Sequence, residues 1–246
     1  MPYAIISDVH SNLEALEVVL QEIDSLGIKD IICLGDLVGY NANPNECIDL
    51  VRRSGIRCIM GNHDLRAIGL QEPIDFNPIA SEAILWTRRR IAPENIEFLR
   101  GLPRRLFFDD GRAMAIHGSI HSTDTYIHSP WDAARNFAMM EENPGLPPVC
   151  FFGHTHVKIC YQEVMRRVIT LHDDEVDIVE GDRYLINPGG VGQPRDMNPR
   201  TAFLVYDADA RKVRFFRKEY AVKRTYQKVV DAGLPRELAD RLLVGW

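Results

Sequence analysis

Residues 3–36 read YAIISDVHSNLEALEVVLQEIDSLGIKDIICLGD, and this stretch decides the fold of the chain. Two apolar runs within it, Tyr3–Ser7 and Asp30–Leu34, have the length and composition of buried strands, and each ends abruptly in small or polar residues. Between them, apolar residues recur at three- and four-residue steps over residues 12–26, and Gly27 stands where a helix C-cap belongs. The pattern predicts a β-α-β unit.

The unit is repeated by a second helical pattern over Asn45–Arg53 and a third strand over Arg57–Met60. A β-α-β-α-β order makes a parallel sheet with helices packed outside it. In such sheets the active-site residues lie beyond the C-terminal ends of the strands. We therefore expect Asp8, Asp36 and Asn62, which follow the three strands, to meet at one edge.

The remaining sequence predicts further strands and helices without a linker or an internal repeat, so we expect one domain over residues 1–246. Residues 119–148 are irregular and contain four prolines, which is typical of loops that flank an active-site edge. The predicted elements are a helical region over 79–101, two short strands over 105–116, one helix around Trp131–Met140, strands at Val149–Phe152, Val157–Tyr161, Arg167–Leu171, Tyr184–Asn187, Thr201–Tyr206 and Val213–Arg217, and helices near Val222–Asp231 and Pro235–Leu243.

Composition excludes several classes of protein. The chain is 46% hydrophobic and 26% charged, which is the balance of a globular protein and not of a disordered or fibrous one. A net charge of -6 argues against a nucleic-acid coat protein, because nonspecific duplex affinity requires Lys and Arg to neutralise phosphates. We expect no membrane span, a cytoplasmic location, and reduced core thiols for the five cysteines, which form no CxxC pair.

Polar motifs follow the predicted strands at five places. Burying two Asp and five His side chains near one sheet edge is costly unless metal ions compensate the charges. Mixed His, carboxylate and amide ligands suit manganese, iron or zinc. The motifs are Asp8-Val9-His10, Gly35-Asp36, Gly61-Asn62-His63-Asp64, His117-Gly118 and Gly153-His154-Thr155-His156.

Each motif taken alone has an ordinary explanation. An Asp after a strand is usually a helix N-cap, as Asp8 could be, and a single His is usually a surface residue. Five such motifs in this order after five predicted strands are hard to attribute to caps and turns.

These motifs make the chain similar to the calcineurin-like metallophosphoesterase superfamily, whose signature is DxH, GD, GNH[DE], a lone His and GHxH. Residues 187–195, Asn-Pro-Gly-Gly-Val-Gly-Gln-Pro-Arg, are similar to a stretch in its small bacterial and archaeal phosphodiesterase-like branch. The resemblance implies an α/β fold, a four-layer αββα sandwich of two mixed sheets flanked by helices. It also implies a hydrolase that cleaves phosphate esters, phosphodiesters above all, with two divalent metal ions and a bridging hydroxide.

Matching positions imply the ligand sets. Asp36 would bridge the two ions and is with His63 a catalytic residue, and His63 would contact the phosphate or protonate the leaving group. Asn62, His63 and Arg195 are the candidate substrate-binding residues, Arg195 because guanidinium matches phosphate oxygens. One ion would be held by Asp8, His10, Asp36 and His156, and the other by Asp36, Asn62, His117 and His154.

Two departures bear on the substrate. Serine/threonine phosphatases of the superfamily carry GDxxDRG, whereas residues 35–40 read Gly-Asp-Leu-Val-Gly-Tyr, so the acidic partner of the catalytic His is missing at Gly39. Gly190 stands where relatives often have Ser. The missing acidic partner favours the phosphodiesterase-like branch, whereas Gly190 argues against a substrate role for the turn in which it lies.

Several alternatives remain open at this stage. The chain could be a phosphomonoesterase of the serine/threonine-phosphatase or nucleotide-phosphatase type, a noncatalytic protein-interaction scaffold on the same fold, or a nuclease. The intact motifs disfavour the scaffold, and the lack of a basic track disfavours the nuclease. A small phosphorylated molecule is the expected partner, and the sequence predicts no oligomeric state.

Overall fold

The computed structural model describes all 246 residues, which form two β-sheets and eight helices. The elements in chain order are β1 (Pro2–Ile6), α1 (Leu13–Ser25), β2 (Asp30–Cys33), α2 (Pro44–Arg53), β3 (Arg57–Cys58), α3 (Asn62–Ala67), α4 (Pro78–Arg88), α5 (Pro93–Arg100), β4 (Arg105–Phe108), β5 (Ala113–Ile116), α6 (Pro130–Glu142), β6 (Val149–Phe151), β7 (Lys158–Val164), β8 (Arg167–Leu171), β9 (Glu175–Asp177), β10 (Arg183–Pro188), β11 (Thr201–Asp207), β12 (Lys212–Lys218), α7 (Val222–Asp231) and α8 (Arg236–Val244).

Both sheets have six strands and mix parallel with antiparallel pairs. The first has the order β3-β2-β1-β11-β12-β9, in which β1, β2 and β3 are parallel. The second has the order β4-β5-β6-β10-β7-β8, in which β5, β6 and β10 are parallel. The predicted parallel β-α-β-α-β unit is therefore confirmed, and residues 201–218 extend its sheet by antiparallel pairing with β1.

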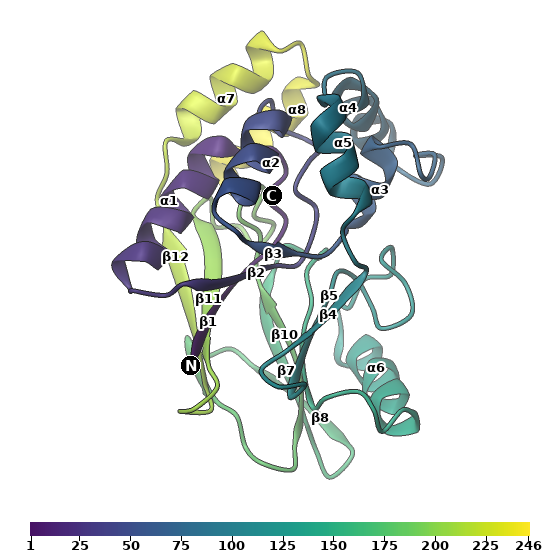
Figure 1. The fold of residues 1–246 in the computed structure, drawn as a ribbon, viewed down its shortest axis with the longest axis vertical. Helices are drawn as coiled ribbons and strands as arrows, with labels where there is room; N and C mark the ends of the chain where they lie inside the picture. Colours follow the sequence, from purple (N-terminus) through teal and green to yellow (C-terminus); the bar gives the residue numbers. More distant parts are fainter.

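Three apolar layers separate the sheets and helices. Side chains alternate across β1, so Tyr3 and Ile5 pack between the two sheets, while Ala4 and Ile6 pack against the helices. The core of the second sheet against α6 contains Phe137. Figure 1 shows α1 and α2 over the first sheet and α6 against the second, which confirms the predicted αββα arrangement.

The structure differs from the prediction at four places. Residues 79–101 form two helices, α4 and α5, because Pro93 disfavours helical backbone at Ala92 and begins a new helix. The short helix α3 and the three-residue strand β9 are too short to show a hydrophobic period, and neither was predicted. Predicted strand 57–60 is paired only at Arg57 and Cys58.

The five cysteines are buried and unpaired, as predicted from their apolar surroundings. None of the helices combines the length and the apolar character needed to cross a lipid bilayer.

Candidate metal centre

Seven side chains converge where strands of both sheets end. Asp8 and His10 follow β1, Asp36 follows β2, and Asn62 begins α3 after β3. The second sheet contributes the others. His117 follows β5, and His154 and His156 follow β6. All seven are at most 5% exposed, although every one of them is polar or charged. The structure thus brings together every residue of the two predicted ligand sets.

The backbone of five of these residues is left-handed, with φ between 46° and 67°. Non-glycine residues rarely adopt this conformation, and it is maintained only where the surrounding structure imposes it. The imposed turns direct side chains back over the strand ends, toward one another. The five residues are Asp8, His10, Asp36, His154 and His156.

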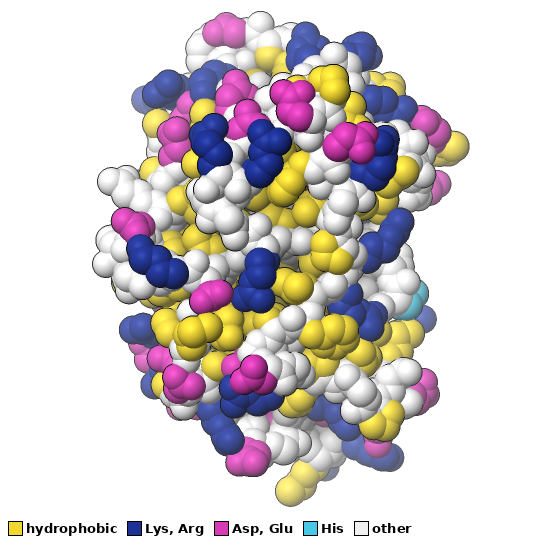
Figure 2. All heavy atoms as spheres, viewed as in Figure 1, with side chains coloured by type: hydrophobic (Ala, Val, Ile, Leu, Met, Phe, Trp, Pro, Cys, Tyr) yellow, Lys and Arg dark blue, Asp and Glu magenta, His cyan; other side chains and the backbone are white.

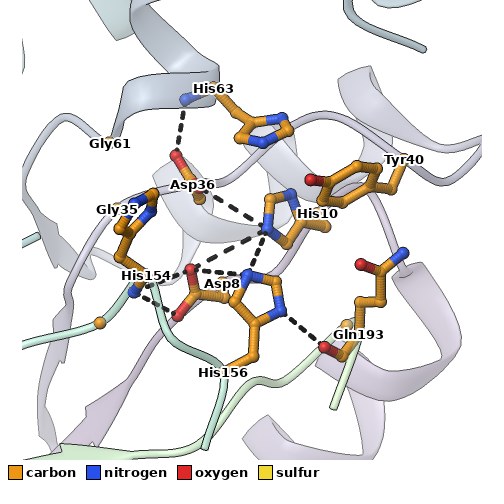
Figure 3. A network of polar contacts seen from close by, with 12 residues as sticks. Asp8, His10, Gly35, Asp36, Tyr40, Gly61, His63, His154, His156 and Gln193 are labelled. Carbon is orange, nitrogen blue, oxygen red and sulfur yellow. Dashed lines mark hydrogen bonds and ion pairs between the residues drawn. The ribbon is translucent and has the colours of Figure 1, made fainter. Parts of the chain in front are cut away.

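One cluster consists of Asp8, His10 and His156. The Nε2 atoms of His10 and His156 lie 3.1 Å apart, and His156 Nε2 lies 3.3 Å from Asp8 Oδ1. His10 Nε2 also lies 3.6 Å from Asp36 Oδ2. Figure 3 shows these four side chains pointing into a common space, with Asp36 on the side away from His156.

The other cluster consists of Asp36, Asn62, His117 and His154. His117 Nε2 lies 3.2 Å from Asp36 Oδ2 and 3.0 Å from Asn62 Oδ1. Ligand atoms of Asp36, His117 and His154 all lie within 4.8 Å of one another. Asp36 Oδ2 therefore faces both clusters, and it is buried without a hydrogen-bond donor. An orphaned carboxylate oxygen in this position fits a shared cation.

The histidines are held with their lone pairs pointing inward. Nδ1 of His10 donates to the Val38 carbonyl (3.0 Å), and Nδ1 of His156 donates to the Gln193 carbonyl (2.6 Å). His117 Nδ1 likewise donates to the Leu34 carbonyl at 2.8 Å. A carbonyl only accepts, so each of these nitrogens carries the proton and each Nε2 is left as a lone pair.

His154 also donates a ring N–H to a backbone carbonyl, but it does so through Nε2 instead of Nδ1. Its Nε2 faces the Asp124 carbonyl at 3.3 Å, which leaves Nδ1 as the free lone pair. Lone pairs of four imidazoles, two carboxylates and one amide oxygen then converge with few protons between them. Such a set of donors fits divalent cations, and the outer carbonyls are the partners that metal-bound imidazoles require.

Burial reinforces this protonation pattern. It lowers the pKa of His10 to about 3 and the pKa of His154 and His156 well below the ordinary value, so these rings are neutral, as metal ligands must be. Burial raises the pKa of the Asp8 carboxyl to about 6. His117 is the exception: burial opposes its charge, but the nearby Asp36 carboxylate outweighs burial and raises its pKa to about 9. Without a metal its Nε2 therefore also carries a proton, and a cation at this site would replace that proton.

Comparison with known proteins agrees with this geometry. The family model described as the calcineurin-like phosphoesterase superfamily domain matches residues 1–211. The chain belongs to this superfamily. It is accordingly a phosphoester hydrolase by family, and the resemblance drawn from its five motifs is confirmed.

Similar proteins cover the whole chain. The Methanocaldococcus jannaschii protein MJ0912, itself described as uncharacterized, is 37% identical over 98% of this chain and 97% of its own length. The crystal structure of a metallophosphoesterase from Sphaerobacter thermophilus is 39% identical, with a TM-score of 0.85 and coverage of 100% and 99% of the two chains. The hypothetical protein PH1004 from Pyrococcus horikoshii OT3 shares the fold, with a TM-score of 0.83, 20% identity and coverage of 100% and 98%.

Within the superfamily motif GNH[DE], residue Asp64 fixes the start of α3. Its carboxylate accepts hydrogen bonds from the Gly61 N–H (3.0 Å) and the Val38 N–H (3.2 Å). It thereby ties the loop after β2 to the loop after β3. Burial raises the pKa of the Asp64 carboxyl to about 7. Through these two hydrogen bonds Asp64, the acidic residue of the motif, positions Asn62 and His63.

His63 stands beside the clusters, and its surroundings explain the departure at Gly39. The His63 backbone N–H donates to Asp36 Oδ1 at 2.8 Å (Figure 3). Its ring packs against Tyr40 and Phe76, with centroids 4.5 and 4.6 Å away. A Cβ at Gly39 would lie 2.5 Å from His63 Nδ1, so the ring occupies the space that a side chain would need. Packing, and not a carboxylate, orients this histidine.

The structure also places Arg195 near the first cluster. Its Nη2 donates to Tyr40 Oη and to Gln193 Oε1, both at 3.2 Å, and its backbone N–H donates to the His156 carbonyl at 3.3 Å. It forms no ion pair, and its buried Nε has no partner. Its uncompensated charge therefore lies at the edge of the metal centre.

Sequence reasoning missed several residues that support the site. Gln193 accepts from His156, Asp124 accepts from His154, and the buried Arg66 pairs with Asp124 at 2.8 Å. Tyr40 and Tyr126 also lie against ligand rings. Tyr40 packs on His10 with centroids 4.5 Å apart, and Tyr126 stacks on His154 at 3.9 Å. No local sequence pattern distinguishes such contacts.

Proposed function

We propose that this protein hydrolyses phosphodiesters with two divalent metal ions, one held by Asp8, His10, Asp36 and His156 and the other by Asp36, Asn62, His117 and His154. The observation that carries the proposal is the orphaned Asp36 Oδ2, which faces both clusters from a fully buried position. Such a pair of ions would lower the pKa of a water molecule and supply positive charge for the phosphoryl oxygens. Manganese, iron and zinc all suit the donor set.

Local charge explains how an acidic protein attracts phosphate. The two carboxylates are too few to neutralise two divalent ions, so the centre is positive although the whole chain carries a net charge of -6. Arg195 adds a further cation beside the first cluster. The field of the site therefore favours an anionic phosphate ester.

Specific side chains would then orient the substrate. Asn62 offers its amide, and His63 lies between Tyr40 and Phe76 with its Nδ1 unpartnered, so that its ring can contact the phosphate. Burial lowers the pKa of His63 well below its ordinary value, so the ring would protonate the leaving oxygen only after the anionic phosphate has raised that pKa. Arg195 can donate to phosphoryl oxygens and stabilise the charge that builds on them. Matching positions in the superfamily imply the role of His63, and the donor geometry of guanidinium supports that of Arg195.

A cavity beside the second cluster supports a diester substrate. It has a volume of about 190 Å³, and its wall includes Asn62, His154, Phe76 and Tyr126. Two aromatic rings next to two ligands offer a surface for an organic group esterified to the phosphate. A phosphomonoester has one organic group and needs one such cavity, whereas a phosphodiester has two. A second cavity, lined by His117, is present beside the same cluster.

The molecular surface favours a small substrate over a nucleic acid. Figure 2 shows Lys and Arg interspersed with Asp and Glu on the face that it displays, without a continuous basic track. Polyanion binding needs clustered cations along one face.

The test is hydrolysis of bis(p-nitrophenyl) phosphate and of p-nitrophenyl phosphate by metal-free protein supplied with manganese, iron or zinc. We expect metal-dependent release of p-nitrophenol, with a larger kcat/KM for the diester. A larger kcat/KM for the monoester would instead establish the phosphomonoesterase. Absence of turnover with every metal would favour the noncatalytic scaffold.

A further inference from the structure

A second polar cavity opens directly beside the metal centre. Its volume is about 380 Å³, and it lies between the start of β4, the loop over residues 118–124, and Gln71 after α3. Most of its lining is polar, including Arg104, Arg105, His117 and His121. The volume is ample for a phosphate group together with ordered water.

The two arginines in this cavity have no acidic partner. Arg104 is exposed and Arg105 is half-buried, and neither belongs to any ion pair of the structure. The only side-chain bond of Arg105 runs from Nη2 to the Ile120 carbonyl at 2.8 Å. One carboxylate does line the cavity, that of Asp124, but Arg66 pairs with it at 2.8 Å. The cavity therefore keeps a net positive charge.

The cavity shares residues with the metal centre. His117 lines it and also places its Nε2 3.2 Å from Asp36 Oδ2. Asp124 lines both this cavity and the one beside His154. The Met60 N–H donates to the Pro103 carbonyl at 2.8 Å, which holds the start of β4 against the turn that leads to Asn62. A molecule bound at the metals can therefore extend into this cavity.

The cavity wall is held in place by short contacts. Ser119 N–H donates to the Ser122 carbonyl at 2.8 Å, and Ile120 N–H donates to Asn136 Oδ1 at 3.0 Å. A Cβ at Gly118 would lie 2.7 Å from the carbonyl oxygens of Ser122 and Thr123. The loop after His117 is thus packed against its own backbone, and this wall of the cavity is formed before a ligand arrives.

We propose that this cavity, which we call the Arg104/Arg105 subsite, binds a second phosphate group of the substrate. Two unpaired guanidinium groups match phosphate oxygens, and His121 with Ser122 adds further polar groups to the wall. The substrate class is then a phosphodiester that carries another phosphate within one nucleoside-sized unit of the scissile bond. This inference rests on the proposed hydrolase function.

A matched pair of chromogenic diesters tests the subsite. The p-nitrophenyl ester of thymidine 5′-phosphate and the same compound with an added 3′-phosphate differ only in the second phosphate. We expect the 3′-phosphate to raise kcat/KM of the wild-type enzyme about tenfold, which corresponds to about 1.4 kcal/mol. In Arg104→Gln and Arg105→Lys the ratio of the two kcat/KM values should fall at least about threefold.

A charge-matched control is Arg53→Gln, because Arg53 is exposed at the far end of α2 and lines neither cavity. In Arg53→Gln the ratio of kcat/KM with and without the 3′-phosphate should equal the wild-type ratio. A wild-type ratio near one, or a ratio that Arg104→Gln and Arg105→Lys leave unchanged, overturns the subsite. Failure of the proposed function looks different, since neither ester would then release p-nitrophenol with any metal.

Discussion

The Nε2 atoms of His10 and His156 face each other at 3.1 Å, and both rings donate their Nδ1–H to backbone carbonyls. Two lone pairs in contact repel, and burial deprives them of water as an alternative partner. A cation between them removes the repulsion. Folding and metal binding should therefore be coupled in this protein.

The first prediction concerns thermal stability and metal. At a metal concentration about 100 times Kd, binding adds about 2.7 kcal/mol to stability, which for a chain of this size raises Tm by roughly 5–10 °C. Differential scanning fluorimetry with EDTA and with added manganese measures the shift. The double variant His10→Ala, His156→Ala should lose most of it, whereas His172→Ala, at an exposed position, should retain it. Equal shifts in the two variants would contradict metal binding at this pair.

Asp36→Asn should separate stability from activity. The change preserves the shape of the side chain but removes the buried negative charge of Oδ2, which has no hydrogen-bond donor. We expect kcat/KM to fall by at least about a thousandfold, or about 4 kcal/mol, because a shared metal ligand is lost. Tm in EDTA should fall only modestly, because Asn still accepts from the His63 N–H but no longer pairs with the charged His117. Wild-type turnover by Asp36→Asn would refute the bridging position, and an increase of Tm in EDTA would refute the pairing of Asp36 with a charged His117.

The ligand set could be predicted because each ligand follows a strand, and parallel strands bring their C-terminal ends to one edge. Asp8 lies where a helix N-cap was the ordinary alternative, but Asn12 caps α1 by accepting from the Ala15 N–H at 3.2 Å. Asp8 is thereby free for the centre. The parallel β-α-β-α-β unit likewise follows from the apolar runs and helical periods of residues 3–60, whereas the two-sheet sandwich was implied by the resemblance to the superfamily.

Other features of the site depend on contacts between distant segments. The Gln193 carbonyl reaches His156 across 37 residues, and Arg66 reaches Asp124 across 58 positions of sequence that contain two helices and two strands. Neither residue has a local pattern that marks it, so pattern reasoning cannot find it. The same holds for the Arg104/Arg105 subsite, whose wall is assembled from Gln71, the start of β4 and residues 116–124.

Gly39→Ala should impair His63 selectively. The added Cβ would lie 2.5 Å from His63 Nδ1, and φ at this position is +98°, so the ring must move. We expect kcat to fall about 10- to 100-fold while two metals remain bound, as measured by metal analysis of the purified protein. Gly27→Ala is the matched control, because its φ is +72° and nothing lies within 4 Å of the added Cβ. If both variants lose the same activity, backbone strain and not displacement of His63 is responsible.

Gly192→Ala should disrupt the fold near the first cluster. The new Cβ would lie 1.8 Å from the Val9 carbonyl oxygen, and the Gly192 N–H donates to the Asp8 carbonyl at 2.9 Å. Backbone must shift, at a cost of at least about 2–3 kcal/mol. Urea unfolding measures the change in the free energy of unfolding. Gly145→Ala, where nothing lies within 4 Å of the added Cβ, should change it by less than about 1 kcal/mol. Equal stabilities of the two variants would rule out the close approach of Gly192 to Val9.

Arg195→Gln should weaken the substrate interaction without removing metal. The guanidinium is held by Tyr40 Oη and Gln193 Oε1, both 3.2 Å from Nη2, and its buried Nε has no partner in the protein. A charge-assisted hydrogen bond to phosphate contributes about 1.5–3 kcal/mol, so kcat/KM for bis(p-nitrophenyl) phosphate should fall about 10- to 100-fold.

Two variants isolate the role of Arg195. Arg200→Gln removes the same charge from an exposed position and should retain wild-type kcat/KM. Tyr40→Phe removes one of the two acceptors that orient the guanidinium, and its kcat/KM should lie between those of Arg195→Gln and the wild type. Because metal affinity depends on Asp8, His10 and their partners, all three variants should bind two metals per chain. An unchanged kcat/KM in Arg195→Gln would show that this guanidinium does not contact the phosphate, and a loss of metal would show that it acts through the ligands.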